Sequence, residues 1–399
     1  MKKIMILGAS ILQLPAINKA KMMGLDVIAV DMNPNAEGFR VSGIKKEIIS
    51  TTDIPEVIRI ARKHNIDGIM TLASDMPMRT VAAVVKELNL IGIDYDTAIK
   101  ATDKYKMRTA LMEMNVPIPI FIKVNSKKEF YCAVDKIRNS GKECIIKPVD
   151  NSGSRGIQLL DNYKQDVLDK AFEYSIQYSK SGELMVEEYM NGAEVSVETL
   201  SLNNECNIIQ ITDKLTTGAP YFVEMGHSQP SCLTKEIQEE ICKVAIAANK
   251  AIGIKIGPSH TEIKVTEDGP KVVELGARLG GDNISTHLTQ FSTGIDMVES
   301  CINITLGLPV NIEKKWDKGA AIRYFESDSG MIKRIKGIDF VNDIPGLKEL
   351  KFVFNIGDYA RPIRSSSDRV GFVISQSKTA IDAIKVCDKV LENVQIEVD

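Results

Sequence analysis

The sequence predicts a mixed α/β and α+β protein built from more than one domain. The chain has 399 residues, whereas single domains usually contain about 100 to 200. Up to about residue 100, short apolar runs alternate with amphipathic segments, which is typical of parallel β–α–β units. Beyond that point, two glycine-rich stretches, 151–156 and 276–281, interrupt the expected strands. We expect domains at 1–100, 101–312 and 313–399.

The first domain is expected to have a Rossmann-like parallel fold. Its predicted strands are 4–7, 26–31 and 68–72. Its predicted helices are 12–23, 55–64 and 78–88. The Gly8 turn, with Asp31 closing the second strand, superficially resembles a dinucleotide-binding fingerprint. Ser10 and Gln13 stand where that fingerprint needs glycine. We therefore expect a scaffold domain rather than an NAD site.

The other two domains are expected to mix strands and helices. The second begins with a helix at 103–114 and contains a hairpin of strands 260–265 and 271–275, joined at Asp268-Gly269. The last 85 or so residues predict a small α+β domain. Its elements are the strands 351–355 and 370–375 and the amphipathic helix 378–392.

Composition excludes several classes of partner. Fifty basic residues face 53 acidic ones, the net charge is -3 and no long run of one sign occurs, so we expect neither nucleic acid nor a membrane surface as a partner. Seven scattered cysteines without a C-x-x-C pair indicate the reducing cytoplasm. No apolar run approaches the roughly 20 residues of a membrane span. A signal peptide at the lysine-containing start is the alternative to a first buried strand.

The segment 145–156 places Lys147 on a strand and follows it with a small, donor-rich loop. Glycine lets such a loop bring several backbone N–H groups onto phosphate oxygens. It is not a Walker A loop, because no G-K-[ST] follows at the required spacing. A surface hairpin is the alternative reading of this loop in isolation. The loop residues expected at a nucleotide are Ser152, Gly153, Ser154 and Gly156.

Charged residues accompany this loop in a characteristic order. They are Asp103-Lys104, Lys147, the segment 186–190, Glu194, Glu262, Glu274 and Arg278. This order over roughly residues 1–310 resembles the ATP-grasp superfamily, notably its biotin carboxylase-like and amino acid ligase branches. The resemblance implies an ATP-grasp domain at 101–312, with ATP and Mg²⁺ or Mn²⁺ as cofactors. It also implies an ATP-dependent ligase that forms a C–N bond from a small-molecule carboxylate and an amine, through an acyl phosphate.

The resemblance also assigns nucleotide contacts. Lys104 and Lys147 would hold the α- and β-phosphates, because a lysine is a compact positive charge suited to phosphate oxygens. The expected adenine and ribose contacts are Glu187, at the exocyclic amine, the backbone around Glu188 and Met190, and Glu194. Adjacent residues of a strand point to opposite faces, so an exposed, inert Glu188 remains the alternative.

The expected metal and transfer centre lies on the 260–275 hairpin. There Glu262 and Glu274 can sit side by side, and hard magnesium ions favour carboxylate oxygens. Without a cation such opposed glutamates would repel each other. Gly276 stands where the family typically has asparagine, so one ligand is missing or comes from elsewhere. Arg278 is expected to stabilise charge during phosphoryl transfer, with pairing to Asp282 as the structural alternative.

The substrate contacts are expected in the polar, turn-rich stretch 214–230, which resembles the substrate loop of amino acid ligases. Glu224 and His227 would hold an ammonium group or assist its deprotonation, and a purely structural histidine is the alternative. Lys214 is a candidate γ-phosphate contact. Gly281, in the second glycine-rich stretch, is a further substrate candidate.

Two other functions stay open. One is a purine-pathway ligase, such as phosphoribosylglycinamide synthetase or a carboxyaminoimidazole ribonucleotide-type enzyme, in which the Gly8 turn would bind a ribose phosphate. The other is a non-catalytic ATP-binding regulatory protein, suggested by Gly276. A homodimer is also left open.

Overall fold

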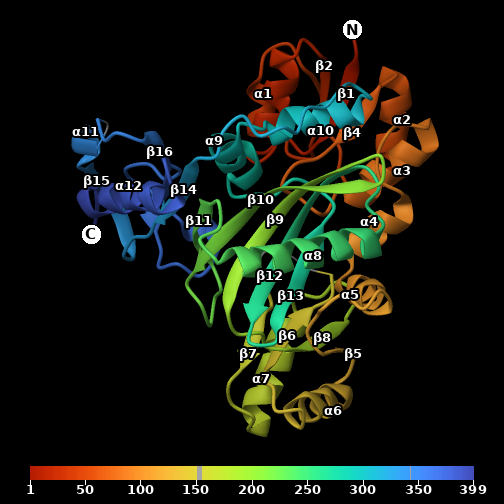
Figure 1. Cartoon of the computed structure of the whole chain (residues 1–399), viewed down its shortest axis with the longest axis vertical. Coiled ribbons are helices and arrows are strands. Elements are labelled where there is room, and N and C mark those ends of the chain that lie inside the picture. Colours follow the sequence, from red (N-terminus) through yellow and green to blue (C-terminus); the bar gives the residue numbers. More distant parts are fainter. Residues whose placement is uncertain (151–154, 342) are drawn as a thin grey trace.

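The computed structural model describes residues 1–150, 155–341 and 343–399. The strands of a long antiparallel sheet lie in the middle of the molecule, with a parallel sheet at the top, a smaller antiparallel sheet at the bottom and the C-terminal segment to one side (Figure 1). Within the described residues, no helix combines the length and the apolar character needed to cross a bilayer.

The N-terminal part is a parallel sheet with the strand order β3-β2-β1-β4. The expected strands and helices are confirmed. One strand, the short polar edge strand β3, was not expected, because K-K-E carries no apolar signal. The elements are β1 (Lys3–Leu7), α1 (Leu14–Met22), β2 (Asp26–Val30), η1 (Glu37–Arg40), β3 (Lys45–Glu47), α2 (Ile54–His64), β4 (Gly68–Met70), α3 (Met78–Leu88) and α4 (Tyr95–Thr102).

A four-stranded antiparallel sheet follows, with the order β5-β8-β6-β7. Helices α6 and α7 cover one face of it, where Ile146 and Val186 enter a core with Phe130 and Phe172. Alternation along the strands turns the neighbouring side chains to the other face. The elements are α5 (Lys104–Glu113), β5 (Phe121–Val124), α6 (Lys127–Arg138), β6 (Cys144–Pro148), β7 (Gln158–Leu160), α7 (Gln165–Ile176) and β8 (Leu184–Glu188).

The long antiparallel sheet has the order β13-β12-β9-β10-β11-β14-β18-β16. It runs across position 312, because β11 pairs with β14. Its strands up to that position are β9 (Ala193–Leu202), β10 (Glu205–Thr216), β11 (Glu224–Gln229), β12 (Gly257–Thr266) and β13 (Gly269–Gly276). The helical elements of this region are α8 (Lys235–Ile252), η2 (Ile284–Leu288), α9 (Thr289–Thr293) and α10 (Met297–Thr305).

The C-terminal part completes the long sheet and adds a small sheet of order β17-β15-β19. Helix α12 packs on β14 and β18 through Val373, Ala383, Cys387 and Val390. The elements are β14 (Gly319–Phe325), β15 (Gly330–Lys336), α11 (Ile338–Val341), β16 (Leu347–Phe352), β17 (Tyr359–Ala360), η3 (Ser366–Asp368), β18 (Gly371–Ser377), α12 (Ala380–Asn393) and β19 (Gln395–Val398).

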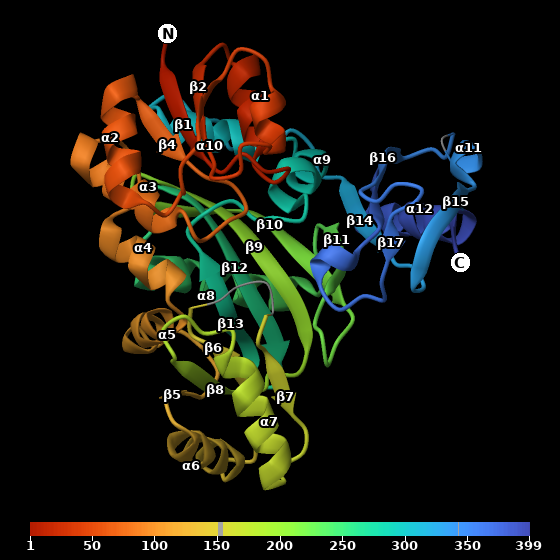
Figure 2. The ribbon, with the colours of Figure 1, turned by 180° about the vertical axis from the view of Figure 1, so that it is seen from behind.

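Later segments close the cores of earlier ones. Met297 and Ile302 of α10 pack with Ile17 of α1 and Met70 of β4, so the N-terminal sheet is completed by a helix from beyond residue 290 (Figure 2). Helix α8 packs on β13 in the core that also holds Met107 of α5. The division into three domains at 100 and 312 stays a prediction.

Candidate active site

A cleft of about 450 Å³ collects residues from all parts of the chain. Its walls come from the smaller sheet, the long sheet, the loop after β4 and the segment before β18. Ser152, Gly153 and Ser154 lie outside the described residues, and Gly156 is not part of the lining. The expected site residues that line the cleft are Lys104, Lys147, Glu187, Glu188, Met190, Glu194, Lys214, Glu224, His227, Glu262, Glu274, Arg278 and Gly281.

Glu187 is the centre of a buried ion cluster at one end of the cleft. It accepts hydrogen bonds from Arg108 Nε at 2.6 Å and pairs with Lys147 Nζ at 2.5 Å. Burial alone would raise the pKa of Glu187, but the two cations lower it to about 2. Burial is the main influence on Lys147 and lowers the pKa of its ammonium despite Glu187. The Glu187 carboxylate thus has partners other than the expected adenine amine, and it holds the ammonium group of Lys147 in place.

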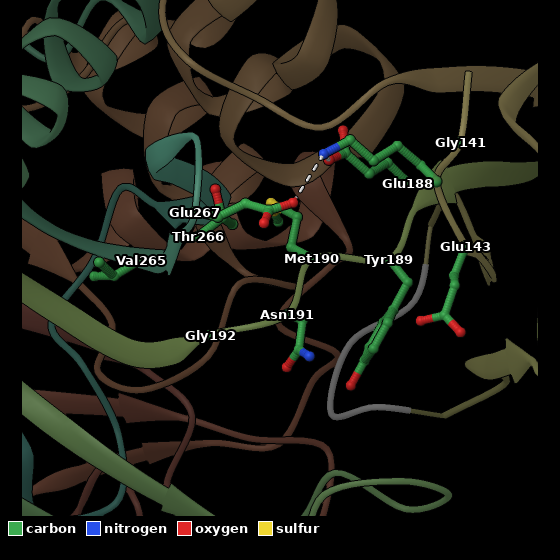
Figure 3. A pocket seen from close by; sticks show the side chains of 11 residues that line it. Gly141, Glu143, Glu188, Tyr189, Met190, Asn191, Gly192, Val265, Thr266 and Glu267 are labelled. Atoms are coloured by element: carbon green, nitrogen blue, oxygen red, sulfur yellow. Dashed lines mark ion pairs between the residues drawn. The ribbon is translucent and has the colours of Figure 1, made fainter.

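A second hollow, of about 420 Å³, shares Glu188, Tyr189 and Met190 with the cleft (Figure 3). The Glu188 carboxylate is buried, with Lys271 Nζ at 2.9 Å and Lys142 Nζ at 3.7 Å. It also accepts a hydrogen bond from the amide of Ile120. An exposed, inert Glu188 is therefore not what the structure shows. In the same segment the amide of Glu188 donates to Ile120 O and the amide of Tyr189 donates to Glu143 O, each at 2.8 Å.

The two expected metal glutamates face each other across the hairpin. Glu262 on β12 is registered opposite Glu274 on β13, as expected. A lysine now neutralises each: Lys214 Nζ lies 2.9 Å from Glu262 and Lys104 Nζ lies 2.7 Å from Glu274. The described residues contain no group of three or more His, Cys, Asp or Glu side chains arranged to hold a metal. A metal here would therefore need further oxygen ligands, such as phosphates and water.

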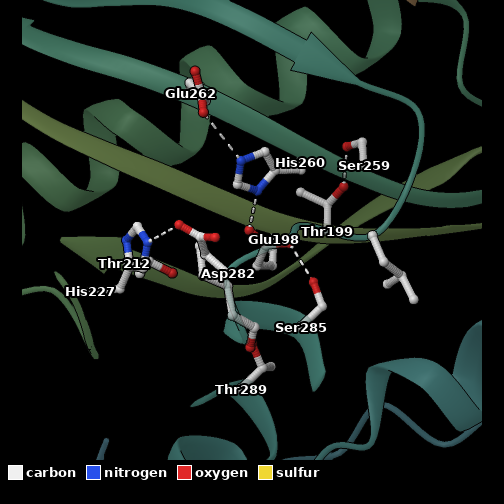
Figure 4. A network of polar contacts seen from close by, with 12 residues as sticks. Glu198, Thr199, Thr212, His227, Ser259, His260, Glu262, Asp282, Ser285 and Thr289 are labelled. Atoms are coloured by element: carbon white, nitrogen blue, oxygen red, sulfur yellow. Dashed lines mark hydrogen bonds and ion pairs between the residues drawn. The ribbon is translucent and has the colours of Figure 1, made fainter. Parts of the chain in front are cut away.

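Glu262 also ends a chain of polar contacts that runs from β12 to the neighbouring strand β9 (Figure 4). His260 Nε2 lies 3.5 Å from Glu262, and His260 Nδ1 lies 2.5 Å from the fully buried Glu198. Burial would lower the pKa of His260, but Glu198 raises it to about 9. The protonated imidazole therefore joins Lys214 in balancing the negative charge at Glu262.

Arg278 is held by a residue from the N-terminal part. Its Nε and Nη2 donate to the two Asp75 oxygens, each at 2.9 Å, so the expected alternative partner Asp282 is wrong. A Cβ at Gly276 would lie 2.9 Å from Asp75 Oδ1 and 3.1 Å from Arg278 Cζ. The space an asparagine would need at 276 is thus filled by the ion pair. Burial would raise the pKa of Asp75, but Arg278 lowers it.

The two ends of the expected substrate loop are strand: β10 ends at Thr216, and Glu224–Gln229 is β11, which pairs with β10 and with β14. Lys214 lies opposite His227 in this pairing. Lys214 contacts Glu194 at 2.7 Å and Glu224 at 3.5 Å as well as Glu262, and these glutamates raise the pKa of its ammonium although burial would lower it. His227 Nε2 lies 3.3 Å from Asp282, a residue the sequence singled out only as a partner for Arg278.

Sequence reasoning missed several charged groups of this site. Arg108 follows Lys104 by four residues on one helix, which places both on the same face and is a signal that was present. Asp75 follows a parallel strand at its carboxyl end, where ligand-contacting residues gather in such sheets. Arg369, which pairs with Asp282, carries no comparable signal, because it depends on how the C-terminal part docks.

Two family models match the chain. An ATP-grasp domain matches residues 140–287, and an L-amino acid ligase C-terminal domain 2 matches residues 323–399, which together exceed half of the chain. This chain contains an ATP-grasp domain and, after it, an L-amino acid ligase C-terminal domain. The ATP-grasp match includes the glutamates and Arg278, and the second match includes Arg369. The enzyme is thus an ATP-dependent ligase that forms C–N bonds.

Similar proteins span more than one kind of ligase. Alanine–anticapsin ligase of Bacillus subtilis (strain 168) is 26% identical over 272 residues, which cover 63% of this chain and 56% of that protein. The L-amino acid ligase from Bacillus licheniformis superposes with a TM-score of 0.85 at 21% identity, covering 100% of this chain and 99% of that one. Phosphoribosylglycinamide synthetase from Anaerococcus prevotii superposes with 0.80 at 22% identity over 100% of both. These structural likenesses show the fold.

The Glu187 cluster predicts a specific pH dependence of stability. The pKa of Glu187 in the fold, about 2, lies below its ordinary value of 4.5, so its contribution is complete above pH 4.5 and is lost as pH falls toward 2. We expect Glu187→Gln to lower the free energy of unfolding at pH 7 by about 3 kcal/mol, because two buried cations lose their partner. Urea titrations should show that difference shrinking below pH 4.5. Glu56→Gln, which breaks an exposed pair with Arg59, should have a smaller effect. A Glu187→Gln difference independent of pH would contradict the assignment.

The Asp75–Arg278 pair predicts non-additive kinetics. Asp75→Asn should lower carboxylate-dependent ADP release about tenfold, because Arg278 loses the side chain that orients it. Gly276→Ala should act in the same direction by displacing Asp75. The double variant should be no worse than the more impaired single variant, since both changes break one contact. ATP affinity serves as the control and should not change. Multiplying effects would show that Gly276 acts separately from the pair.

Proposed function

We propose that this ligase joins two amino acids, activating the carboxylate of one with Mg-ATP and transferring its acyl group to the amine of the other. The observation that carries the proposal is the mixed charge at the inner end of the cleft. Arg278 supplies a cation for a carboxylate or acyl phosphate, while Glu224, His227 and Asp282 supply groups for an ammonium. A zwitterionic amino acid needs both kinds of group.

The other end of the cleft supports the assignment of the nucleotide. Lys147, anchored by Glu187, and Lys104, now on Glu274, are placed to contact phosphates. We assign the ribose hydroxyls to Glu194 and the purine edge to backbone groups around Glu188 and Met190. Arrival of a triphosphate would give both lysines stronger partners and free the glutamates.

Glu262 and Glu274 suit Mg²⁺ because hard cations prefer carboxylate oxygens, and the two face each other across the hairpin. We propose that both hold the ion, with phosphates and water completing its shell. Bound magnesium would neutralise charge on the transferring phosphoryl group. Lys214 and His260, which now balance Glu262, would then keep this carboxylate in position.

The N-terminal turn favours an amino acid over a ribonucleotide. Its amides are already used: Gly8 N donates to Val30 O, Ala9 N to the Asp31 carboxylate, and Ser10 N to Gln13 Oε1. A ribose phosphate bound there would need those donors, and the Asp31 carboxylate would repel it. This supports an amino acid substrate over phosphoribosylamine.

The reaction would proceed in two steps. The donor carboxylate attacks the γ-phosphorus and ADP leaves, which gives an acyl phosphate near Arg278. The amine of the acceptor attacks the acyl carbon, the C–O bond to phosphate breaks, and inorganic phosphate leaves. The burial of the cleft limits water, which would otherwise hydrolyse the intermediate.

The cellular setting also belongs to the proposal. All seven cysteines are free thiols, which supports a reducing cytoplasm. The partners would be small molecules, and a homodimer stays a prediction.

The proposal predicts ADP release that depends on two amino acids together. A panel of amino acid pairs with Mg-ATP should identify combinations that yield ADP and a dipeptide, detected by mass spectrometry. Phosphoribosylamine with glycine should yield neither. Glu274→Ala and Arg278→Ala should each lower turnover by about 100-fold, because charge on the transferring group loses its stabilisation. Release of ADP only with the ribonucleotide substrate, or turnover undiminished in both variants, would overturn the proposal.

A further inference from the structure

Asp282 occupies an unusual position at the inner end of the cleft. It has a left-handed backbone with φ 49°, and so does the next residue, Asn283, with φ 61°. Non-glycine residues adopt this conformation at some cost and keep it where the surrounding structure holds them. Two consecutive such residues turn the Asp282 carboxylate toward His227 (Figure 4).

The C-terminal part holds Asp282 in that position. Arg369 Nη1 and Nη2 donate to the two carboxylate oxygens at 2.7 and 2.8 Å, and Tyr324 Oη donates to the Asp282 backbone carbonyl at 3.2 Å. The Arg369 guanidinium lies 3.7 Å from the centre of the Tyr324 ring and also donates to Glu224 O. Such a bidentate pair fixes orientation as well as charge.

Asp282 keeps capacity for another donor. Each carboxylate oxygen can accept two hydrogen bonds, and Oδ1 accepts one, from Arg369. Beside it, the His227 ring is 1% exposed, and its Nδ1 has no hydrogen-bond partner among the described residues. A buried nitrogen without a partner is rare and needs an explanation. Both residues line the cleft.

We propose that Asp282, positioned by Arg369, binds the α-ammonium group of the acceptor amino acid, and that His227 takes a proton from it before attack. This inference rests on the proposed function. Asp282 would attract the positively charged form of the amine, which predominates at neutral pH. It would also stabilise the imidazolium that His227 becomes, as a carboxylate does when it orients a histidine base.

The proton and bond balance is complete. One N–H proton of the ammonium moves to the imidazole of His227, which leaves a lone pair on nitrogen. That lone pair forms the new C–N bond at the acyl carbon, and the C–O bond to phosphate breaks with its electron pair on oxygen. The second N–H proton ends on the departing phosphate. The chain thereby divides the work: Arg278 serves the donor, and Asp282 with His227 serves the acceptor.

Hydroxylamine separates the acceptor step from the activation step. It is largely unprotonated at neutral pH and attacks acyl phosphates directly, so it needs no bound carboxylate or base. We therefore expect Asp282→Asn to lower kcat/KM for the acceptor amino acid about 100-fold, as loss of acid–base assistance does, while hydroxamate formation from donor, Mg-ATP and hydroxylamine stays near wild type. The deficit should shrink as the pH rises toward the pKa of the free acceptor ammonium.

Arg369→Lys tests the positioning role. It keeps a positive charge but loses the bidentate fork, so it should raise KM for the acceptor while leaving hydroxamate formation unchanged. The matched control is Asp296→Asn, the same carboxylate-to-amide change in an ion pair with Lys19 that does not line the cleft. This control should leave both reactions unchanged.

The outcomes separate this inference from the proposed function. Absence of any hydroxamate with wild-type enzyme across the amino acid panel would overturn the proposed function. Hydroxamate formation that falls as much as peptide formation in Asp282→Asn would overturn the acceptor assignment alone, since it would indicate a structural role. Wild-type acceptor kinetics in Asp282→Asn would overturn it as well.

Discussion

Two bidentate arginine–aspartate pairs hold the turn at 276–282, and each pair fixes its own end of the turn. The Arg278 side chain pairs with Asp75 of the N-terminal part, and the Asp282 side chain pairs with Arg369 of the C-terminal part. Five residues of sequence, from Arg278 to Asp282, thus connect three parts of the chain. Guanidinium–carboxylate pairs impose direction as well as attraction, so each fixes an angle between elements that are distant in sequence.

A second constraint is that charges in the cleft are buried before any ligand arrives. Taking an ion out of water is costly unless an opposite charge replaces the lost hydration. The ion pairs Lys104–Glu274 and Lys214–Glu262 meet that condition, and so does the cluster of Glu187 with its cations. Binding of Mg-ATP would therefore exchange partners rather than expose new charge. The phosphates would draw Lys104 away from Glu274, and the metal would bind the released carboxylate.

The sequence predicted those parts of the molecule whose signals are local. Strand and helix periodicity located most elements of the N-terminal sheet, and the Asp268-Gly269 turn predicted the hairpin of β12 and β13. A register shift between Glu262 and Ile263, which the sequence did not indicate, brings Glu262 opposite Glu274. Partners that are distant in the sequence could not be predicted from it. Nothing in the neighbourhood of Arg278 indicates Asp75, which lies 203 residues earlier. Within the stretch 214–230 the strand β11 (Glu224–Gln229) was not expected, because its polar residues form a strand only through pairing with β10 and β14, while the residues between β10 and β11 are a loop.

That pairing has a consequence for how acceptor and nucleotide sites relate. Strand β11 carries Glu224 and His227, and it lies between β10, which carries Lys214, and β14 of the C-terminal part. A Cβ at Gly226 would lie 2.6 Å from Arg323 Nη1, and Arg323 donates to the carbonyl of His227. The C-terminal part therefore sets the position of the acceptor side chains. The strands β6, β8, β12 and β13, which carry the residues proposed for ATP and Mg²⁺, do not pair with strands of the C-terminal part. Changes confined to residues beyond 312 can consequently move Glu224 and His227, the proposed acceptor contacts, while leaving β6, β8, β12 and β13 in register.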